Sequence, residues 1–171
     1  MKRLAVMLAL SAAACSGEPA TKAPAAQDRA SAAPTTAAPA QPAGLAGLYE
    51  GGSPPRRNQL CMTEDGETLR FGLVVWGAGR NSCSGIGTAT RERDRLRLAM
   101  AGDEACRIEA TLGTDGAVTL PARTPAGCAY YCGAGASLAD VRLERAGGGP
   151  RAAARARDLV GEPLCGSQEG S

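Results

Sequence analysis

The sequence contains no histidine, and its only lysines are Lys2 and Lys22. Without histidine, the Ser-His-Asp and Cys-His mechanisms have no general base, and a domain without lysine cannot use Ser-Lys or Schiff-base catalysis. The aromatic content is also low, at 3%, with one Phe and one Trp, so few bulky side chains are available for a core. We therefore predict that the chain is not an enzyme, with no catalytic residue, no cofactor and no metal ligand.

The region after the first 43 residues contains 15 arginines and 15 acidic residues, so its positive and negative charges balance. This balance provides no positive field to attract a polyanion. Nucleic acid is therefore not an expected partner.

Paired carboxylates remain as a catalytic possibility, because such pairs can hydrolyse glycosides. Glu64, Asp65 and Glu67 share one predicted turn, and Asp103 and Glu104 share another. Polar residues flank both groups, which favours solvated turn charges. A carboxylate-dependent hydrolase of cell-wall glycan is the alternative.

The N-terminus begins with Lys2 and Arg3, followed by an apolar run over residues 4–14 that ends in three alanines. A positive start, a short apolar stretch and small residues before the cleavage point are typical of a secretory signal peptide. The run has 11 residues, whereas a membrane-spanning helix needs about 20. We predict that residues 1–14 are a cleaved export signal.

Residues 10–15, Leu-Ser-Ala-Ala-Ala-Cys, resemble the lipobox of bacterial lipoproteins. The resemblance implies lipidation of Cys15, and the serine after it implies sorting to the outer membrane. Two or more acyl chains anchor a protein stably. We therefore expect an exported protein of the bacterial cell envelope, held at the outer membrane through its lipid anchor and facing the periplasm. Lipoboxes usually have Leu, Val or Ile where this chain has Ala12, so cleavage by an ordinary signal peptidase is the alternative.

A tether is predicted over residues 15–43, which begin with Cys15. Residues 16–43 contain 11 alanines and 5 prolines, and no Leu, Ile, Val, Met or aromatic residue. The prolines interrupt helices, and without apolar side chains the ordering of the backbone is not compensated. We predict a disordered spacer.

Residues 44–146 are predicted to form one β domain, because apolar and polar residues alternate there with the period of half-buried strands. The clearest strands are expected at 68–76, 95–100, 106–112 and 137–144, and weaker ones at 45–50, 58–64, 82–91 and 117–120. Asp65-Gly66 and Asp115-Gly116 are suited to tight hairpins. We predict an all-β fold, a small antiparallel meander barrel or sandwich of about eight strands, with the barrel favoured because it removes exposed edges.

Residues 147–171 are predicted to be a glycine-rich linker at 147–149, a short solvated helix at 150–160 and a mobile tail. Pro150 suits the first turn of a helix, and Gly161 suits its end.

Six cysteines follow Cys15, and an even number in an exported domain predicts three disulfides. They are Cys61, Cys83, Cys106, Cys128, Cys132 and Cys165. Pairing in sequence order is our expectation among the 15 possible connectivities: Cys61–Cys83, Cys106–Cys128 and Cys132–Cys165. The Cys128-x-x-x-Cys132 spacing fits neither a thioredoxin-type redox pair nor, without histidine, a common zinc site.

Large side chains that could anchor a partner are few, and we single out Tyr130, Tyr131 and Trp76 as candidate binding residues. The alternative is that one or both tyrosines fill the core. The prediction for the domain is a non-enzymatic binding module for an envelope protein or glycan. A purely structural surface protein is a further alternative.

Overall fold

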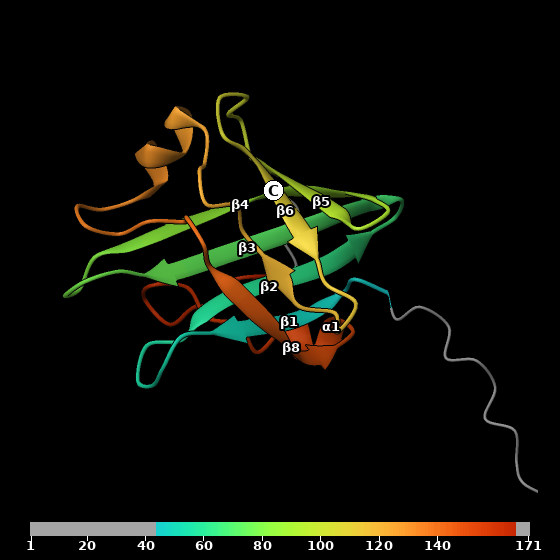
Figure 1. Cartoon of the computed structure of the whole chain (residues 1–171). Helices are drawn as coiled ribbons and strands as arrows, with labels where there is room; N and C mark the ends of the chain where they lie inside the picture. Colours follow the sequence, from blue (N-terminus) through green and yellow to red (C-terminus); the bar gives the residue numbers. More distant parts are fainter. Residues whose placement is uncertain (1–43, 167–171) are drawn as a thin grey trace, which may run out of the picture. The chain divides into compact units, whose positions relative to one another are not determined.

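A computed structural model describes residues 44–166, and in it eight antiparallel strands close into a barrel (Figure 1). The strands are β1 (Gly47–Gly51), β2 (Asn58–Asp65), β3 (Thr68–Trp76), β4 (Ser82–Glu92), β5 (Arg95–Met100), β6 (Arg107–Leu112), β7 (Val118–Thr119) and β8 (Arg142–Gly148). Each strand pairs with the next, and β1 pairs with β8. The predicted all-β meander is confirmed, and it is a barrel rather than a sandwich.

The sequence alternation places apolar side chains inside the barrel. On β5, Leu96, Leu98 and Met100 are buried while Arg95 and Arg97 face outward. The β2–β3 hairpin turns at Gly66, whose positive φ of 61° is accessible to glycine at little cost. Apolar side chains from all around the barrel form one continuous core that fills its interior.

The strand predicted at 137–144 is wrong, because β8 begins only at Arg142 and continues to Gly148. Leu138 is buried from a loop, and Asp140 has a positive φ of 58°, which lies outside the β region of regular strands. Gly147 and Gly148, predicted to lie in a linker, belong to the barrel. A Cβ atom on Gly47 of β1 would lie 2.3 Å from the Gly147 carbonyl oxygen, so glycine permits this close approach at the closure.

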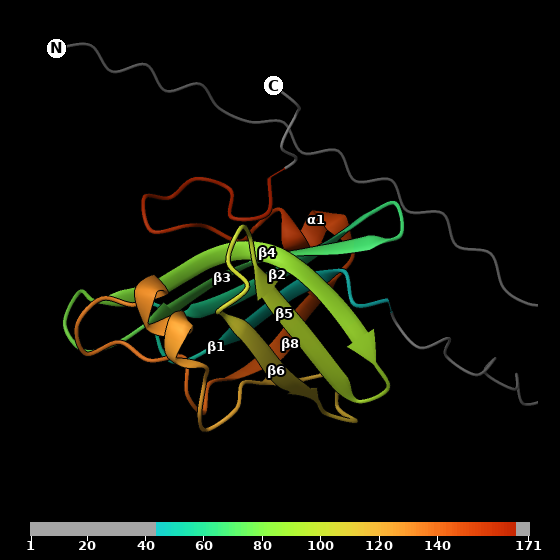
Figure 2. The same cartoon turned by 90° about the horizontal axis from the view of Figure 1, so that it is seen from above.

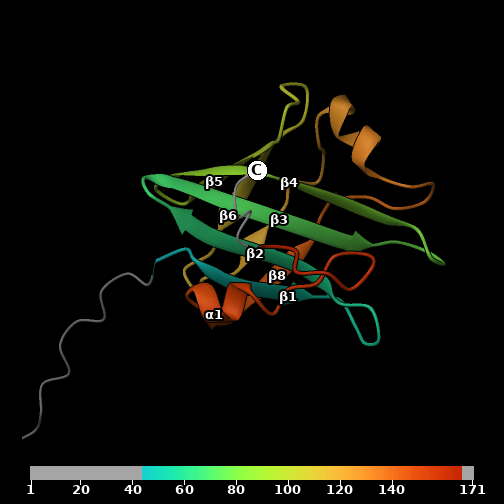
Figure 3. The same cartoon turned by 180° about the vertical axis from the view of Figure 1, so that it is seen from behind.

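The predicted helix at 150–160 is also shorter than expected, since α1 spans only Pro150–Ala153. Ala152, Ala153 and Ala156 are buried against Leu48 and Cys61 on the outside of the barrel. Figure 3 shows α1 and the following segment beside β1 and β2. Small alanine side chains supply the apolar face of α1, and Ala156, Leu164 and Cys165 hold the following segment on the wall, while most of its other residues, including Leu159 and Val160, are exposed.

The disulfides are Cys106–Cys128, as predicted, and Cys61–Cys165 and Cys83–Cys132 in place of the other two expected pairs. The predicted Cys61–Cys83 pair is excluded by the barrel wall. Cys83 packs with the interior core, whereas Cys61 packs with the outer cluster under α1. Two cysteines on opposite faces of a sheet cannot approach to bonding distance.

Tyr49 and Arg145 close the end of the barrel at which the described chain begins. The Tyr49 hydroxyl donates to the Leu45 carbonyl at 2.9 Å and accepts from Arg145 Nη1 at 3.0 Å. Arg145 Nη2 donates to the carbonyl oxygens of Gly44 and Ala46, at 2.9 and 3.1 Å. One arginine therefore fixes the entry of the chain into β1. Burial raises the pKa of Tyr49, although Arg145 and Arg91 act in the opposite direction.

We expect the phenolate of Tyr49 to appear only above pH 10.0, the ordinary value for tyrosine. Because the pKa of Tyr49 is higher in the folded state than in the unfolded state, the neutral phenol contributes to folding stability. This contribution is complete below pH 10.0 and is lost as pH rises through the folded-state pKa. Alkaline titration of phenolate absorbance, compared between the protein and its Tyr49→Phe variant, measures this directly. A difference curve centred at or below the ordinary value would contradict the burial of Tyr49.

Candidate functional site

The longest connection in the barrel joins β7 to β8, and we call its residues 121–140 the η1 loop after the 3-10 helix η1 (Ala126–Tyr131) within it. It is closed at its base by a hydrogen bond from the Leu120 amide to the Val141 carbonyl, at 2.8 Å. Two residues suffice for a hairpin, and ordered loops of this length are uncommon in compact domains and are often functional. The η1 loop is therefore the first candidate for a functional surface.

The barrel topology sets the position of the η1 loop. In an up-and-down barrel, the β1–β2, β3–β4, β5–β6 and β7–β8 connections all lie at one end, and the chain enters at the other. Figures 1 and 2 agree, since the orange η1 lies far from the cyan start of the described chain. The η1 loop thus projects from the end opposite Gly44.

Two of the three disulfides hold the η1 loop. Cys128 is bonded to Cys106, just before β6, and Cys132 is bonded to Cys83 in β4. The Gly133 amide also donates to the Ser82 carbonyl at 2.9 Å. The two bridges bracket the Tyr130-Tyr131 pair, so the covalent attachment fixes the segment from which both rings project.

Close backbone packing adds to this attachment. A Cβ atom on Gly127 would lie 2.6 Å from the Cβ of Ala105, and one on Gly77 would lie 2.5 Å from the Cα of Ala136. The η1 loop therefore rests directly on the β5–β6 and β3–β4 connections, at two positions where only glycine fits.

Tyr130 and Tyr131 have different roles in the structure, although their rings touch. The ring centroids are 5.5 Å apart at 85°, an edge-to-face contact. Tyr131 packs against the core above Gly85, and burial, followed by the nearby Asp103, raises its pKa. Tyr130 is 88% exposed. Tyr131 is partly buried against the core, and Tyr130 is presented to solvent.

Trp76, the third candidate, is half-buried at the end of β3 and is covered by a neighbour. The Arg56 guanidinium lies 5.3 Å from the ring centroid, and Arg56 donates to the Gly79 carbonyl. The Trp76 amide donates to Asn58 Oδ1 at 2.8 Å. These contacts join the β1–β2 and β3–β4 connections, and they associate Trp76 with Arg56 rather than with the tyrosines.

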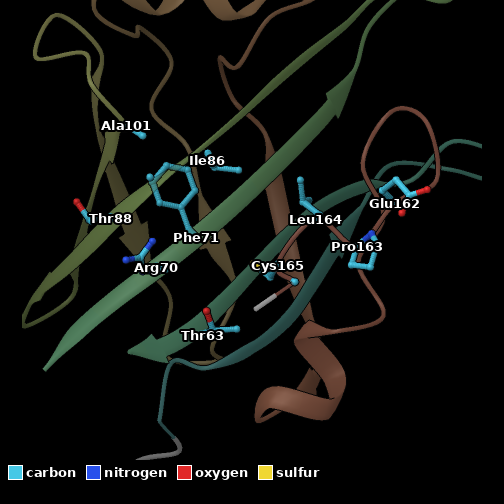
Figure 4. Close-up of a pocket in the computed structure, with 12 residues that line it drawn as sticks. Thr63, Arg70, Phe71, Ile86, Thr88, Ala101, Glu162, Pro163, Leu164 and Cys165 are labelled. Carbon is cyan, nitrogen blue, oxygen red and sulfur yellow. The ribbon is translucent and has the colours of Figure 1, made fainter. Parts of the chain in front are cut away.

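A second candidate is a groove of about 450 Å³ on the outer wall, shown in Figure 4. The segment Glu162–Cys165 lies on one side, and Arg70, Ile86 and Thr88 lie on the other. Ile86 is 51% exposed, and Arg70 is paired with Asp65 at 2.8 Å. Sequence analysis missed this groove because one of its sides is the C-terminal segment, whose docking on the barrel was not predicted. That segment packs on the wall through Leu164, which lies above Gly72.

The acidic turns form local contacts. Glu64, Asp65 and Glu67 are exposed on the β2–β3 hairpin, and Glu64 and Asp65 border a cavity of about 400 Å³. In the other turn, Asp103 accepts the Ala105 amide at 2.7 Å, and Glu104 pairs with Arg107 at 3.3 Å. Within residues 44–166, no group of three or more Cys, Asp or Glu side chains is arranged to hold a metal ion.

No protein-family model, curated protein or solved structure matches this chain. Among the helices of the described part, none has the length and apolar character needed to cross a membrane. The predicted lipidation site, Cys15, lies outside the described residues.

Proposed function

We propose that this protein is an exported, non-enzymatic binding module of the cell envelope and that the η1 loop is its contact surface. One observation carries the proposal: Tyr130, the most exposed of the large apolar and aromatic side chains in the described chain, is mounted between two disulfide-bonded cysteines. Tyrosine is among the residues that contribute most to the affinity of protein interfaces.

The rigidity of the mounting supports the proposal on energetic grounds. A flexible loop loses conformational entropy when it binds, which subtracts from affinity, whereas a covalently fixed loop has already lost most of it. Exposing a tyrosine ring to water contributes nothing to folding. The fixation of Tyr131 and the exposure of Tyr130 are together what a preorganised binding loop requires.

The cellular location of the protein is part of the proposal. Three disulfides support an oxidising compartment, and the lipobox-like segment supports attachment through Cys15. Because the chain enters the barrel at the end opposite the η1 loop, attachment at the N-terminus leaves that loop free to meet a partner.

The test is site-specific photo-crosslinking in the native envelope, with the photoreactive residue at position 130. The control carries it at position 160, since Val160 is 82% exposed but belongs to the C-terminal segment. We expect a discrete adduct from position 130 that is absent from position 160. Equal, diffuse labelling from both positions would contradict a dedicated contact surface and would favour a structural surface protein.

Lipidation has its own test. We expect a labelled fatty acid to be incorporated into the protein and the Cys15→Ser variant to lose both the label and its membrane association. A Cys15→Ser protein that stays bound to membranes would contradict attachment through a lipid on Cys15.

A glycan hydrolase is a second candidate, favoured by the cavity that Glu64 and Asp65 border. It predicts turnover of peptidoglycan fragments that is lost in the Glu64→Gln, Asp65→Asn double variant. The proposed binding module predicts no turnover by either protein.

A further inference from the structure

We infer that the partner of the η1 loop is a protein with an uncharged, concave cleft that receives Tyr130. This inference rests on the proposed function, and it names the chemistry of the surface that Tyr130 contacts.

Charge is missing from the central stretch of the η1 loop. Residues 124–139 contain no Asp, Glu, Lys or Arg, although charged residues make up 21% of the chain. The centres of protein interfaces are depleted of charge and enriched in tyrosine, while their rims are polar. Since residues 124–139 have no charge to offer, and Arg123 and Asp140 lie only at the two ends of the η1 loop, the surface that meets the centre of the loop must not bury a charge of its own, which would be left unpaired.

The η1 loop combines one projecting ring, that of Tyr130, with a hollow of about 310 Å³ lined by small residues such as Ala129 and Gly133. The exposed residues around Tyr130 are small: Pro125, Ala126, Ala129, Gly133, Ala134 and Gly135. Side chains of this size let the walls of a partner approach the backbone closely on both sides of the one large ring. A projecting ring flanked by small residues fits a cleft, whereas a flat surface would touch little except the ring.

A glycan or a lipid surface fits this loop less well. Sugar hydroxyls are bound by several polar side chains, yet besides the tyrosines the side-chain hydroxyls of residues 124–139 are only those of Thr124 and Ser137. Anionic lipid headgroups are attracted by clustered Lys and Arg, and this stretch has neither. A protein cleft needs only apolar contact and one hydrogen bond to the tyrosine hydroxyl.

The polar rim of the proposed contact is the adjacent β5–β6 turn. Asp103 lies beside Tyr131, and Glu104 is exposed and paired with Arg107. Because Glu104 is offset by Arg107 while Asp103 accepts a neutral backbone amide, the rim carries a single net negative charge. Binding should therefore depend weakly on ionic strength.

The test uses the full mature protein and the partner identified through the crosslink at position 130, after that partner has been purified. We expect Tyr130→Ala to weaken binding by roughly 30-fold or more, the effect of losing a hot-spot residue. Ala129→Glu should weaken it comparably, because it introduces a charge into an apolar cleft. The matched control, Val160→Glu, adds the same charge elsewhere and should leave the dissociation constant unchanged. A tenfold rise in salt should change the wild-type constant by less than about threefold.

The outcomes separate the two claims. Adducts with a glycan, a lipid or a second copy of this chain would overturn the inference about the partner, but they would still support the proposed binding module. Tolerance of Ala129→Glu, or a steep fall of affinity with salt, would also overturn it. Failure to obtain any adduct specific to position 130 would overturn the proposed function itself. Circular dichroism of each variant shows that the barrel is intact, as expected for substitutions at exposed positions.

Discussion

Replacing Cys61 and Cys165 together by alanine is expected to lower the free energy of unfolding by about 4 kcal/mol. The bond joins residues 104 apart, and cross-links that close loops of this length restrict the unfolded chain by about 4.7 kcal/mol in the chain-entropy treatment. Urea denaturation of the oxidised proteins measures the change. A loss below about 1 kcal/mol would show that the C-terminal segment holds its place without the bond.

This loss has a visible structural counterpart. The bond holds Leu164 over Gly72 and keeps Leu48 covered by the alanines that follow β8. We expect amide exchange of β1 and β2 to accelerate in the double variant while β5 and β6 remain protected. The exposed substitution Val160→Ala is the control and should change neither stability nor exchange.

Removing the Cys106–Cys128 bond is the second large effect that we expect. The Cys106→Ala, Cys128→Ala variant should lose about 3 kcal/mol of stability, because the bond spans 22 residues and both cysteines are buried. Its distinctive consequence is local: amides of Ala126–Tyr131 should exchange at rates near those of an unfolded peptide, since η1 is then attached only through Cys132 and packing.

The Cys61→Ala, Cys165→Ala variant is the matched control for this second effect. It lacks a disulfide too, but it should keep the η1 loop protected and should keep binding through Tyr130. Full protection of η1 without the Cys106–Cys128 bond would contradict the idea that the bridges preorganise the loop.

The strands and hairpins of the meander could be predicted from the sequence because their signal is local, whereas alternation alone left a barrel and a sandwich both open. The β3 and β5 strands have the bounds that alternation predicts, and the turn at Gly66 follows from the conformational freedom of glycine. Alternation failed as a predictor at residues 137–144. Polar and apolar residues alternate there, yet β8 begins only at Arg142, and Leu138 is buried from a loop. Alternation is necessary for a half-buried strand but does not establish one.

Non-local features could not be predicted in the same way. Disulfide partners depend on which face of the barrel each cysteine occupies, and Cys61 and Cys83 occupy opposite faces. The outer groove depends on the docking of residues 154–166, which contact the wall through only a few side chains, Ala156, Leu164 and Cys165. Sequence analysis could identify the tyrosine pair, yet only the packing of Tyr131 over Gly85 distinguishes this partly buried ring from the exposed ring of Tyr130.

The most direct test of a disulfide-fixed loop that presents Tyr130 is peptide mapping by mass spectrometry, without reduction, of protein recovered from the envelope. Chymotryptic cleavage after Tyr130 or Tyr131 separates Cys128 from Cys132, so each bond can be assigned alone. We predict linked peptides for Cys106–Cys128, Cys83–Cys132 and Cys61–Cys165. Free thiols at Cys128 and Cys132, or a Cys132–Cys165 bond, would contradict the account.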